Sequence, residues 1–367
     1  MYLALQLRVR AMYGVSELRL GHLRLSQKIV VALCMLILGG CDQLSEPTPY
    51  AQIQGSTMGT YYTVQHDHCD VVRNDIERRL DSLNTALSTY QPDSEISVFN
   101  QARQGKIFHP SAALLKTLEG AKHIYQTSGG AFDPTVGPLV DLWGFGPDDA
   151  TNEQPSQEAL DELRSLIGFE KVLVRDDTIA KVIDGVALDL SAIAKGYAVD
   201  VLASLLKDRG CTNFMVDIGG ELVLAGLNAS AQAWRVGVEK PDTSNLGSIQ
   251  LVLSLSGAAV ATSGDYRNFR LIAGKRVDHV MDPRRLAPAD NEVVAVTVVH
   301  ANAMFADGFA TAAMVLGVDD ALKLAQEEGF AVLLMTKSGP DDPIEIHYNA
   351  AMAVLSDGLK LDKISTK

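Results

Sequence analysis

The sequence predicts an α+β fold with antiparallel strand pairing. Short apolar stretches with period-two alternation dominate the second half of the chain, for example WRVGVE at 234–239 and EVVAVTVVH at 292–300. Helical stretches interrupt these strands without the regular alternation of a doubly wound parallel sheet. At 367 residues the chain is long enough for one large domain or two modest ones.

The start of the chain predicts a lipoprotein signal peptide at residues 1–40. Basic residues precede a short apolar run at 29–40, which ends in LGGC and is too short to span a bilayer comfortably. LGGC resembles the lipobox of bacterial lipoproteins, so we expect lipidation at Cys41. Asp42 resembles the signal that keeps such lipoproteins at the inner membrane, which predicts a lipid-anchored protein on its periplasmic side. An uncleaved N-terminal anchor is the alternative.

The body of the chain is expected to begin after a polar, proline-containing tether at 41–52 and to form one domain at 53–367. In its first helix, at 70–88, Ile76 and Leu80 recur at helical spacing behind Asp70, which suits an N-cap. Further helices are expected from Pro110 up to the glycines at 129 and 130, and at 157–167, 195–209, 303–316 and 319–328. Strands are expected at 171–177, 178–185, 186–190, 213–218, 221–226, 234–239, 249–255, 258–262, 292–300, 330–336 and 344–349.

Charge and cysteine content limit the classes of partner and site. The formal net charge of −13 argues against a nucleic-acid partner, because phosphate binding needs clustered basic residues. After signal cleavage only Cys69 and Cys211 would remain unmodified, and an oxidising compartment would permit a disulfide between them. Two unrelated buried thiols are the alternative. No CxxC pair, Cys/His metal spacing or standard nucleotide-binding motif is present.

The stretch LDLSAIAKGYAVD at 188–200 is the first candidate for a site. A strand that turns through small residues into a helix near Lys195 would bring backbone groups and one cation to a single point, and free N–H groups at a helix start favour an anion. Asp189, at the end of the strand, would face the same mouth. The alternative is a tightly packed turn with Lys195 in solvent.

A second stretch, ADGFAT at 306–311, carries oxygen ligands. Asp307 and Thr311 are four residues apart on a predicted helix, so they share one face, which is otherwise small or apolar. With a backbone carbonyl and substrate phosphates they suit Mg²⁺. The alternative is a solvated aspartate and a threonine bonded to its own helix.

Three loop-like stretches are also dense in residues that folding alone does not require. They are SGGAFDPTVGPLVDLWGFG at 128–146, VATSGDYRNF at 260–269 and DHVMDPRR at 278–285, and they contain Asp265, His279 and Asp282. A structural role is the alternative for the histidine.

Together these stretches resemble the ApbE family of flavin transferases of the bacterial envelope. The resemblance extends from GSTMGTYYTV at residue 55 through the stretches above, with VDIGGEL and WRVGVEKP between them, to ADGFAT. It implies a two-part α+β architecture, often grouped with T-fold-like proteins, in which a central cleft holds FAD and Mg²⁺. It also implies transfer of the FMN half of FAD to a threonine hydroxyl of a target membrane protein, with release of AMP.

The resemblance also implies roles for individual residues. A first set would line the pocket for the flavin or the nucleotide: Met58, Tyr90, Ala131, Phe132 and Asp133. Asp189 and Lys195 would contact FAD, and His279 would lie beside the reacting phosphate. Three groups would hold the metal: the carbonyl of Ala192, Asp307 and Thr311.

The proposed chemistry needs a base for the threonine hydroxyl, and His279 is the matching residue that titrates near neutral pH, with Asp189 as the alternative. One departure concerns the loop that follows this histidine, because the family usually continues as DPRTG whereas Arg285 and Leu286 stand here. Loss of the glycine is expected to alter that loop's backbone. FAD hydrolysis to FMN and AMP, or FAD binding without chemistry, are the alternative functions.

Overall fold

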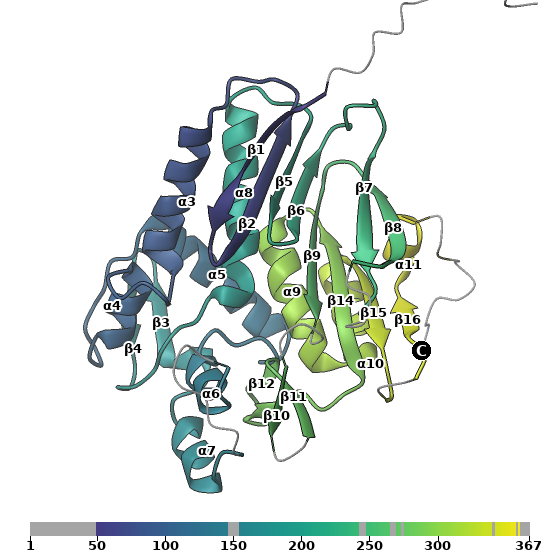
Figure 1. Cartoon of the computed structure of the whole chain (residues 1–367). Coiled ribbons are helices and arrows are strands. Elements are labelled where there is room, and N and C mark those ends of the chain that lie inside the picture. The colour runs from purple at the N-terminus through teal and green to yellow at the C-terminus, as the bar shows by residue number, and fades with distance from the viewer. Residues whose placement is uncertain are drawn as a thin grey trace, which may run out of the picture. The chain divides into compact units, whose positions relative to one another are not determined.

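The core of the computed structural model is one eight-stranded sheet in which every neighbouring pair is antiparallel (Figure 1). The structure describes residues 49–145, 154–241, 247–264, 269–272, 275–339, 342–356 and 359. In spatial order the strands are β1 (Ala51–Thr57), β2 (Thr60–His66), β5 (Phe214–Ile218), β6 (Glu221–Ala225), β9 (Ala258–Gly264), β14 (Val293–His300), β15 (Ala331–Thr336) and β16 (Glu345–Tyr348). The predicted α+β class is confirmed.

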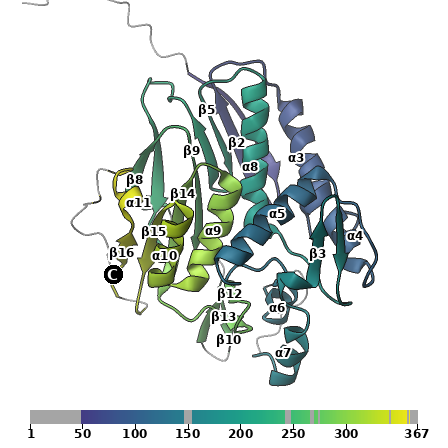
Figure 2. The same cartoon turned by 180° about the vertical axis from the view of Figure 1, so that it is seen from behind.

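Helices cover one face of this sheet, as Figure 2 shows from behind. They are α3 (Arg73–Leu87), α5 (Ala112–Thr127), α8 (Ser191–Asp208), α9 (Ala303–Leu316) and α10 (Val318–Glu328). The other face carries the hairpin of β7 (Trp234–Glu239) and β8 (Ile249–Leu255), together with α11 (Ala350–Ala353). Because both faces are covered, β15 is buried at every position, which explains its uninterrupted apolar sequence.

A smaller part, with its own apolar cluster around Leu139, Trp143 and Leu286, lies at the end of the sheet where α8 and α9 carry the candidate residues. It consists of α6 (Gly137–Leu142), α7 (Gln157–Arg164) and the strand pairs β10 (Phe269–Ile272) with β11 (Lys275–Asp278) and β12 (Met281–Asp282) with β13 (Ala287–Pro288). The remaining elements are α4 (Glu95–Gln101), the 3₁₀ turn η2 (Phe169–Lys171), β3 (Val172–Arg175) and β4 (Thr178–Lys181).

Two local predictions are wrong. Asp70 does not cap α3, because the N-cap is Val72 and makes no side-chain cap bond. The stretch 186–190 has the predicted alternation of buried residues but is not a strand. Its backbone is satisfied by a side chain instead, since Asn100 accepts from the amide of Leu188 at 2.8 Å and donates to the carbonyl of the same residue at 2.8 Å.

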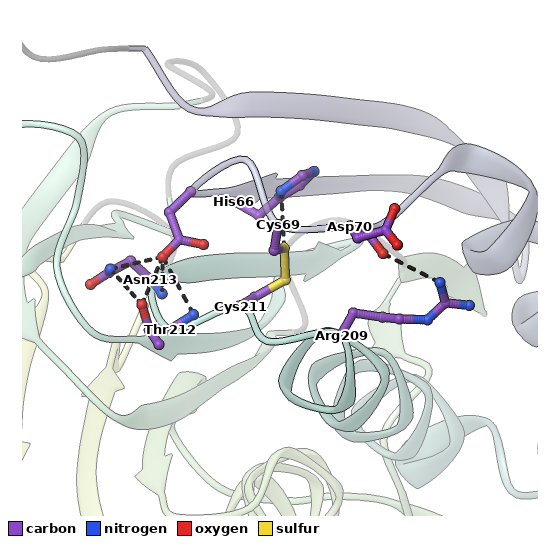
Figure 3. The surroundings of a disulfide bond; sticks show 8 residues. His66, Cys69, Asp70, Arg209, Cys211, Thr212 and Asn213 are labelled. Atoms are coloured by element: carbon purple, nitrogen blue, oxygen red, sulfur yellow. Dashed lines mark hydrogen bonds between the residues drawn. A yellow bond between two sulfur atoms is a disulfide. The ribbon is translucent and has the colours of Figure 1, made fainter.

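Cys69 and Cys211 form a disulfide, which decides between the alternatives that the sequence left open (Figure 3). Their Cα atoms are 5.1 Å apart, and Nδ1 of His66 lies 3.2 Å from Sγ of Cys69. The bond joins the loop after β2 to the chain directly after α8. It therefore fixes the C-terminal end of that helix to the end of β2.

The predicted signal peptide, Cys41 and most of the tether lie outside the described residues, as does Asp265. The strand β1 begins at Ala51, two residues before the expected start of the domain. Within the described part of the chain, no helix has the length and apolar character needed to cross a membrane.

Candidate functional site

A cavity of ≈ 320 Å³ opens where the helical layer, the sheet and the smaller part meet. Its wall is built from six separate segments: the loop before α6, the first turn of α8, the start of β6, the end of β9, the loop around β12, and one face of α9. The cavity gathers most of the predicted site residues: Ala131, Phe132, Asp133, Asp189, Ala192, Lys195, His279, Asp307 and Thr311.

Met58 and Tyr90 are not among the described residues that line this cavity. Met58 lies in the β1–β2 turn with φ 49°. Tyr90 lies shortly after the end of α3 and is 73% exposed. The β1–β2 turn adjoins the β5–β6 turn that leads to the cavity, because the amide of Gly219 donates to the carbonyl of Tyr61 at 3.1 Å. Their predicted contacts with a ligand remain predictions.

The first turn of α8 is fixed by Asp189. Its carboxylate accepts from the amide of Ser191 at 2.8 Å, which satisfies one of the free N–H groups at the helix start. Its own amide donates to the carbonyl of Pro134 at 2.7 Å, and this bond ties the helix start to the loop before α6. Ala192 and Lys195 thus enter the cavity from a helix that begins at Ser191 rather than near Lys195.

The close approach of α8 and α9 depends on Gly196. A Cβ atom there would lie 2.7 Å from the carbonyl carbon of Ala303 and 2.8 Å from Cβ of Asp307, where ordinary contact begins at 3.4 Å. The amide of Gly196 donates to Oδ2 of Asp307 at 2.9 Å. In a regular helix this amide would donate to the carbonyl of Ala192. Because the carboxylate of Asp307 competes for the same proton, the carbonyl of Ala192 is more available to another partner.

The second acid of the 188–200 stretch, Asp200, has a structural role. Its two carboxylate oxygens accept from the amides of Ala303 and Met304, each at 2.9 Å, and so satisfy two free N–H groups at the start of α9. Burial raises the pKa of Asp200 to about 6, against the opposing effect of these two hydrogen bonds. The same segment of α8 therefore carries cavity residues and positions the helix that holds Asp307.

Lys195 lies between two carboxylates in the cavity wall. Its Nζ is 3.1 Å from Oε1 of Glu221 and 4.0 Å from Oδ1 of Asp307. Burial opposes the charge of the lysine, but the two carboxylates outweigh it and raise its pKa. Burial, with Asp307 nearby, raises the pKa of the Glu221 carboxyl above its usual range. The cavity wall therefore holds three ionisable groups. The sequence pointed to Lys195 and Asp307 but not to Glu221.

Glu221 is the residue that the analysis of the sequence missed. It begins β6 directly after the glycines at 219 and 220, it is 5% exposed, and its Oε2 has no hydrogen-bond partner among the described residues. A signal was present in the sequence, because a glutamate that opens an apolar strand after a Gly-Gly turn is costly to bury without a purpose.

The loop that carries Ala131, Phe132 and Asp133 is organised by the aspartate. Its Oδ1 accepts from the amide of Thr135 at 2.8 Å and from the hydroxyl of Thr135 at 2.7 Å. Burial raises the pKa of the Asp133 carboxyl, although these bonds act in the opposite direction. Both bonds join Asp133 to Thr135 of the same loop. Asp133 therefore shapes the loop and also lines the cavity.

The loop around β12 brings His279 to the cavity and closes on an ion pair. Asp282 and Arg284 are joined by two side-chain bonds of 2.9 Å. The backbone of this loop has a left-handed residue where the family usually has glycine, since Leu286 has φ 54°. Its side chain is buried in the cluster with Trp143, and this burial offsets the strain of about 1–2 kcal/mol. The expected effect of Arg285 and Leu286 on this loop's backbone, relative to the rest of the family, remains a prediction.

The oxygen atoms of the cavity suit a hard divalent cation. Asp307 is 3% exposed and Thr311 lies one turn later on α9, where its hydroxyl is 3.4 Å from Oγ of Ser263. Ala192 lines the same cavity. A carboxylate, a hydroxyl and a backbone carbonyl form an oxygen donor set without sulfur or imidazole, which is the set that Mg²⁺ prefers.

Comparisons with known proteins point to one family. A sequence profile described as the ApbE family matches residues 58–334. The FAD:protein FMN transferase of Vibrio cholerae is 38% identical over 316 residues, which cover 84% of this chain and 93% of that protein. The FAD:protein FMN transferase of Salmonella typhimurium is 37% identical over 324 residues, with 84% and 92% covered.

Solved structures of such proteins have the same fold. The flavin transferase ApbE from Vibrio cholerae aligns with a TM-score of 0.77 at 36% identity, over 83% of this chain and 99% of that chain. The apo form of the flavinyl transferase ApbE from Pseudomonas stutzeri aligns with a TM-score of 0.76 at 32% identity, over 84% and 96%.

Proposed function

Since this chain belongs to the ApbE family, we propose that it transfers the FMN half of FAD to a threonine hydroxyl of a target protein and releases AMP. The observation that carries the proposal is the single cavity in which a buried carboxylate, a hydroxyl and an ammonium group meet. Phosphoryl transfer depends on such groups, because it is accelerated mainly by positioning and by neutralising the charge on the phosphoryl oxygens.

We propose that Asp307, Thr311 and the carbonyl of Ala192 hold Mg²⁺. The donor set fits the ion, as described above, and the Asp307 carboxylate is already directed by the amide of Gly196. When bound, the ion would supply charge neutralisation for the diphosphate of FAD. The ammonium group of Lys195 would add a second positive charge at the same wall, close to where the leaving phosphate gains charge.

We assign the role of base to His279. In the proposed reaction the threonine oxygen attacks the phosphorus atom of the FMN half, the bond from that phosphorus to the bridging oxygen breaks, and AMP leaves with this oxygen. The threonine proton passes to a base, and His279 lines the cavity with an imidazole ring that can accept it. Asp189 is less suited, because its carboxylate already accepts the amide of Ser191.

The remaining pocket contacts follow from the position of the residues. Ala131, Phe132 and Asp133 line the cavity, and we propose that they contact the flavin or the nucleotide. Met58 and Tyr90 are proposed to extend this contact beyond the cavity wall. The exposed ring of Tyr90 offers a surface on which a planar ligand can stack.

We also propose that the protein is an inner-membrane lipoprotein on the periplasmic side. The support is the LGGC sequence with Cys41 and Asp42, and the disulfide of the body suits an oxidising compartment. Its targets would then be threonine-bearing proteins exposed at the same membrane face. Labelling cells with a radioactive fatty acid tests the anchor, since a Cys41→Ala variant should lose the label.

A flavin-transfer assay tests the function. The full chain is incubated with FAD, Mg²⁺ and a threonine-bearing flavin-acceptor domain, and covalent flavin is read as fluorescence in a denaturing gel. We expect a fluorescent target band and AMP in equal amounts, and neither when the target threonine is replaced by alanine. AMP released equally well without a target would instead identify a hydrolase, and FAD bound without any AMP would identify a binding protein.

The Asp307→Ala variant tests the cation site in the same assay. Loss of the buried carboxylate should abolish cation binding and transfer together, because the hydroxyl and the carbonyl alone offer no charge to the ion. Glu328→Ala is a matched control, since this acid is paired with His123 at 2.6 Å and does not line the cavity. Full transfer by the Asp307 variant would refute the metal assignment.

A further inference from the structure

The arrangement of Lys195 between two acids leads beyond the proposed reaction. We infer that Glu221 is a positioning residue, which holds the ammonium group of Lys195 away from Asp307 and so keeps Oδ1 of Asp307 available for a cation. This inference rests on the proposed cation site and concerns its regulation by a neighbouring residue. Glu221 itself takes no direct part in the reaction proposed above.

Lys195 is not equally distant from its two acidic neighbours. Nζ is within hydrogen-bond distance of Oε1 of Glu221, at 3.1 Å, but is 4.0 Å from Oδ1 of Asp307. Glu221 comes from the sheet and Asp307 from α9, so the lysine of α8 is drawn toward the sheet. A displacement of about 1 Å would bring it into a direct hydrogen bond with Asp307.

The two carboxylate oxygens of Asp307 have different partners. Oδ2 accepts from the amide of Gly196 at 2.9 Å and is committed to the contact between the helices. Oδ1 is the oxygen that faces Lys195. If Lys195 bonded to Oδ1, both oxygens would be engaged, and a cation would have to displace an ammonium group held in a largely buried wall.

The side chain of Glu221 is itself buried. The residue is 5% exposed and its Oε2 has no partner among the described residues, which is an expensive arrangement for a glutamate whose only task is to fill space. Among the described residues, the side-chain partner that offsets this burial is Lys195. A glutamine or an apolar residue would fill the position at less cost if the lysine did not need a charged partner.

Direct cation binding tests the inference without the transfer reaction. Mn²⁺ binding to the full chain is measured by the loss of the free-ion signal in electron paramagnetic resonance, in the absence of FAD and of any target. We expect Glu221→Gln to weaken binding about tenfold, because the released lysine occupies Oδ1 of Asp307. Glu328→Gln makes the same change in net charge outside the cavity and should leave binding unchanged.

A double-mutant cycle separates positioning from simple charge. If Glu221 acts only as a nearby negative charge, Glu221→Gln costs the same factor whether or not Lys195 is replaced by methionine. If Glu221 positions the lysine, the loss of about tenfold disappears in the K195M background, since no ammonium group remains to occupy Oδ1. Equal factors in the two backgrounds would overturn the inference.

A second variant keeps the test valid if Glu221→Gln does not fold. Glu221→Asp retains the charge but shortens the side chain by one methylene, so it no longer reaches Nζ at 3.1 Å. Positioning predicts weaker Mn²⁺ binding by this variant, whereas a pure charge effect predicts none. Wild-type chain that binds no Mn²⁺, with or without FAD, overturns the inference, while flavin transfer is judged separately by its own assay.

Discussion

Replacement of Gly196 by alanine is the most direct perturbation of the site that leaves the chemical identity of every cavity side chain unchanged. The new methyl group would lie 2.7 Å from the carbonyl carbon of Ala303 and 2.8 Å from Cβ of Asp307, well inside the 3.4 Å at which ordinary contact begins. The carbonyl oxygen lies closer still, so α9 would have to retreat by about 1 Å. Because two helix backbones meet there, no side-chain rotation can relieve the contact.

The cost follows from two opposing effects. Overpacking of this kind costs about 3 kcal/mol at the upper end of its usual range. Alanine in place of glycine within a helix returns about 1 kcal/mol. We therefore expect a net loss of about 2 kcal/mol in the free energy of unfolding. Activity should fall further, about 100-fold, since a shift of about 1 Å at Asp307 misplaces a proposed ligand.

Urea unfolding and flavin transfer measure the two effects, and Gly120→Ala is the matched control. Gly120 also lies in a helix against α9, but its added methyl would meet the flexible end of Met304, with Cε at 2.5 Å and Sδ at 3.0 Å. The free energy of unfolding of the Gly120→Ala variant should differ from that of the wild type by no more than about 1 kcal/mol. If the Gly196 variant keeps the stability and the activity of the wild type, the close approach of α8 and α9 does not hold the site together.

Two further outcomes are expected. Reduction of the Cys69–Cys211 disulfide should lower the free energy of unfolding by up to about 5 kcal/mol, because the bond closes a loop with a sequence separation of 142 residues. Equal urea midpoints with and without a reductant would contradict this. Burial raises the pKa of Asp200 to about 6, so the folded state binds this proton more tightly than the unfolded state and the contribution of the group to stability is lost as pH rises from about 4 to about 6. Asp200→Asn should flatten the melting temperature over that interval, and an unchanged pH profile would refute the assignment.

Local pattern predicted the regular elements well, because periodicity reports which side of a helix or strand is buried. Ile76 and Leu80 lie on the buried face of α3, and α9 spans the predicted 303–316. The stretch 186–190 shows the limit of this reasoning, since its alternation is real but its backbone partner is the side chain of Asn100, 88 positions away. The pattern of burial within one segment does not tell whether a neighbouring strand or a side chain will form hydrogen bonds with its backbone.

The candidate site was predictable where its residues occur in dense motifs. Asp189, Lys195 and Asp307 stood out because small residues surround them, and the structure explains this surrounding by the close packing of α8 and α9. Glu221 did not stand out, because its role depends on Lys195 from another element. The sequence left the Cys69–Cys211 disulfide as one of two alternatives, since two isolated cysteines carry no information on their distance in the fold.

Asp307 links the stability of the fold to the proposed chemistry. Its Oδ2 holds α8 against α9 through the amide of Gly196, and its Oδ1 is left to Lys195 or to a cation. A buried carboxylate with one free oxygen is costly, and either positive partner relieves that cost. Closer pairing with Lys195 would therefore stabilise the cation-free fold while it hinders cation binding. Because Glu221 prevents this pairing, the cation-free fold is less stable than it would be with Lys195 bonded to Asp307. In return, Oδ1 of Asp307 stays available as a ligand for the cation.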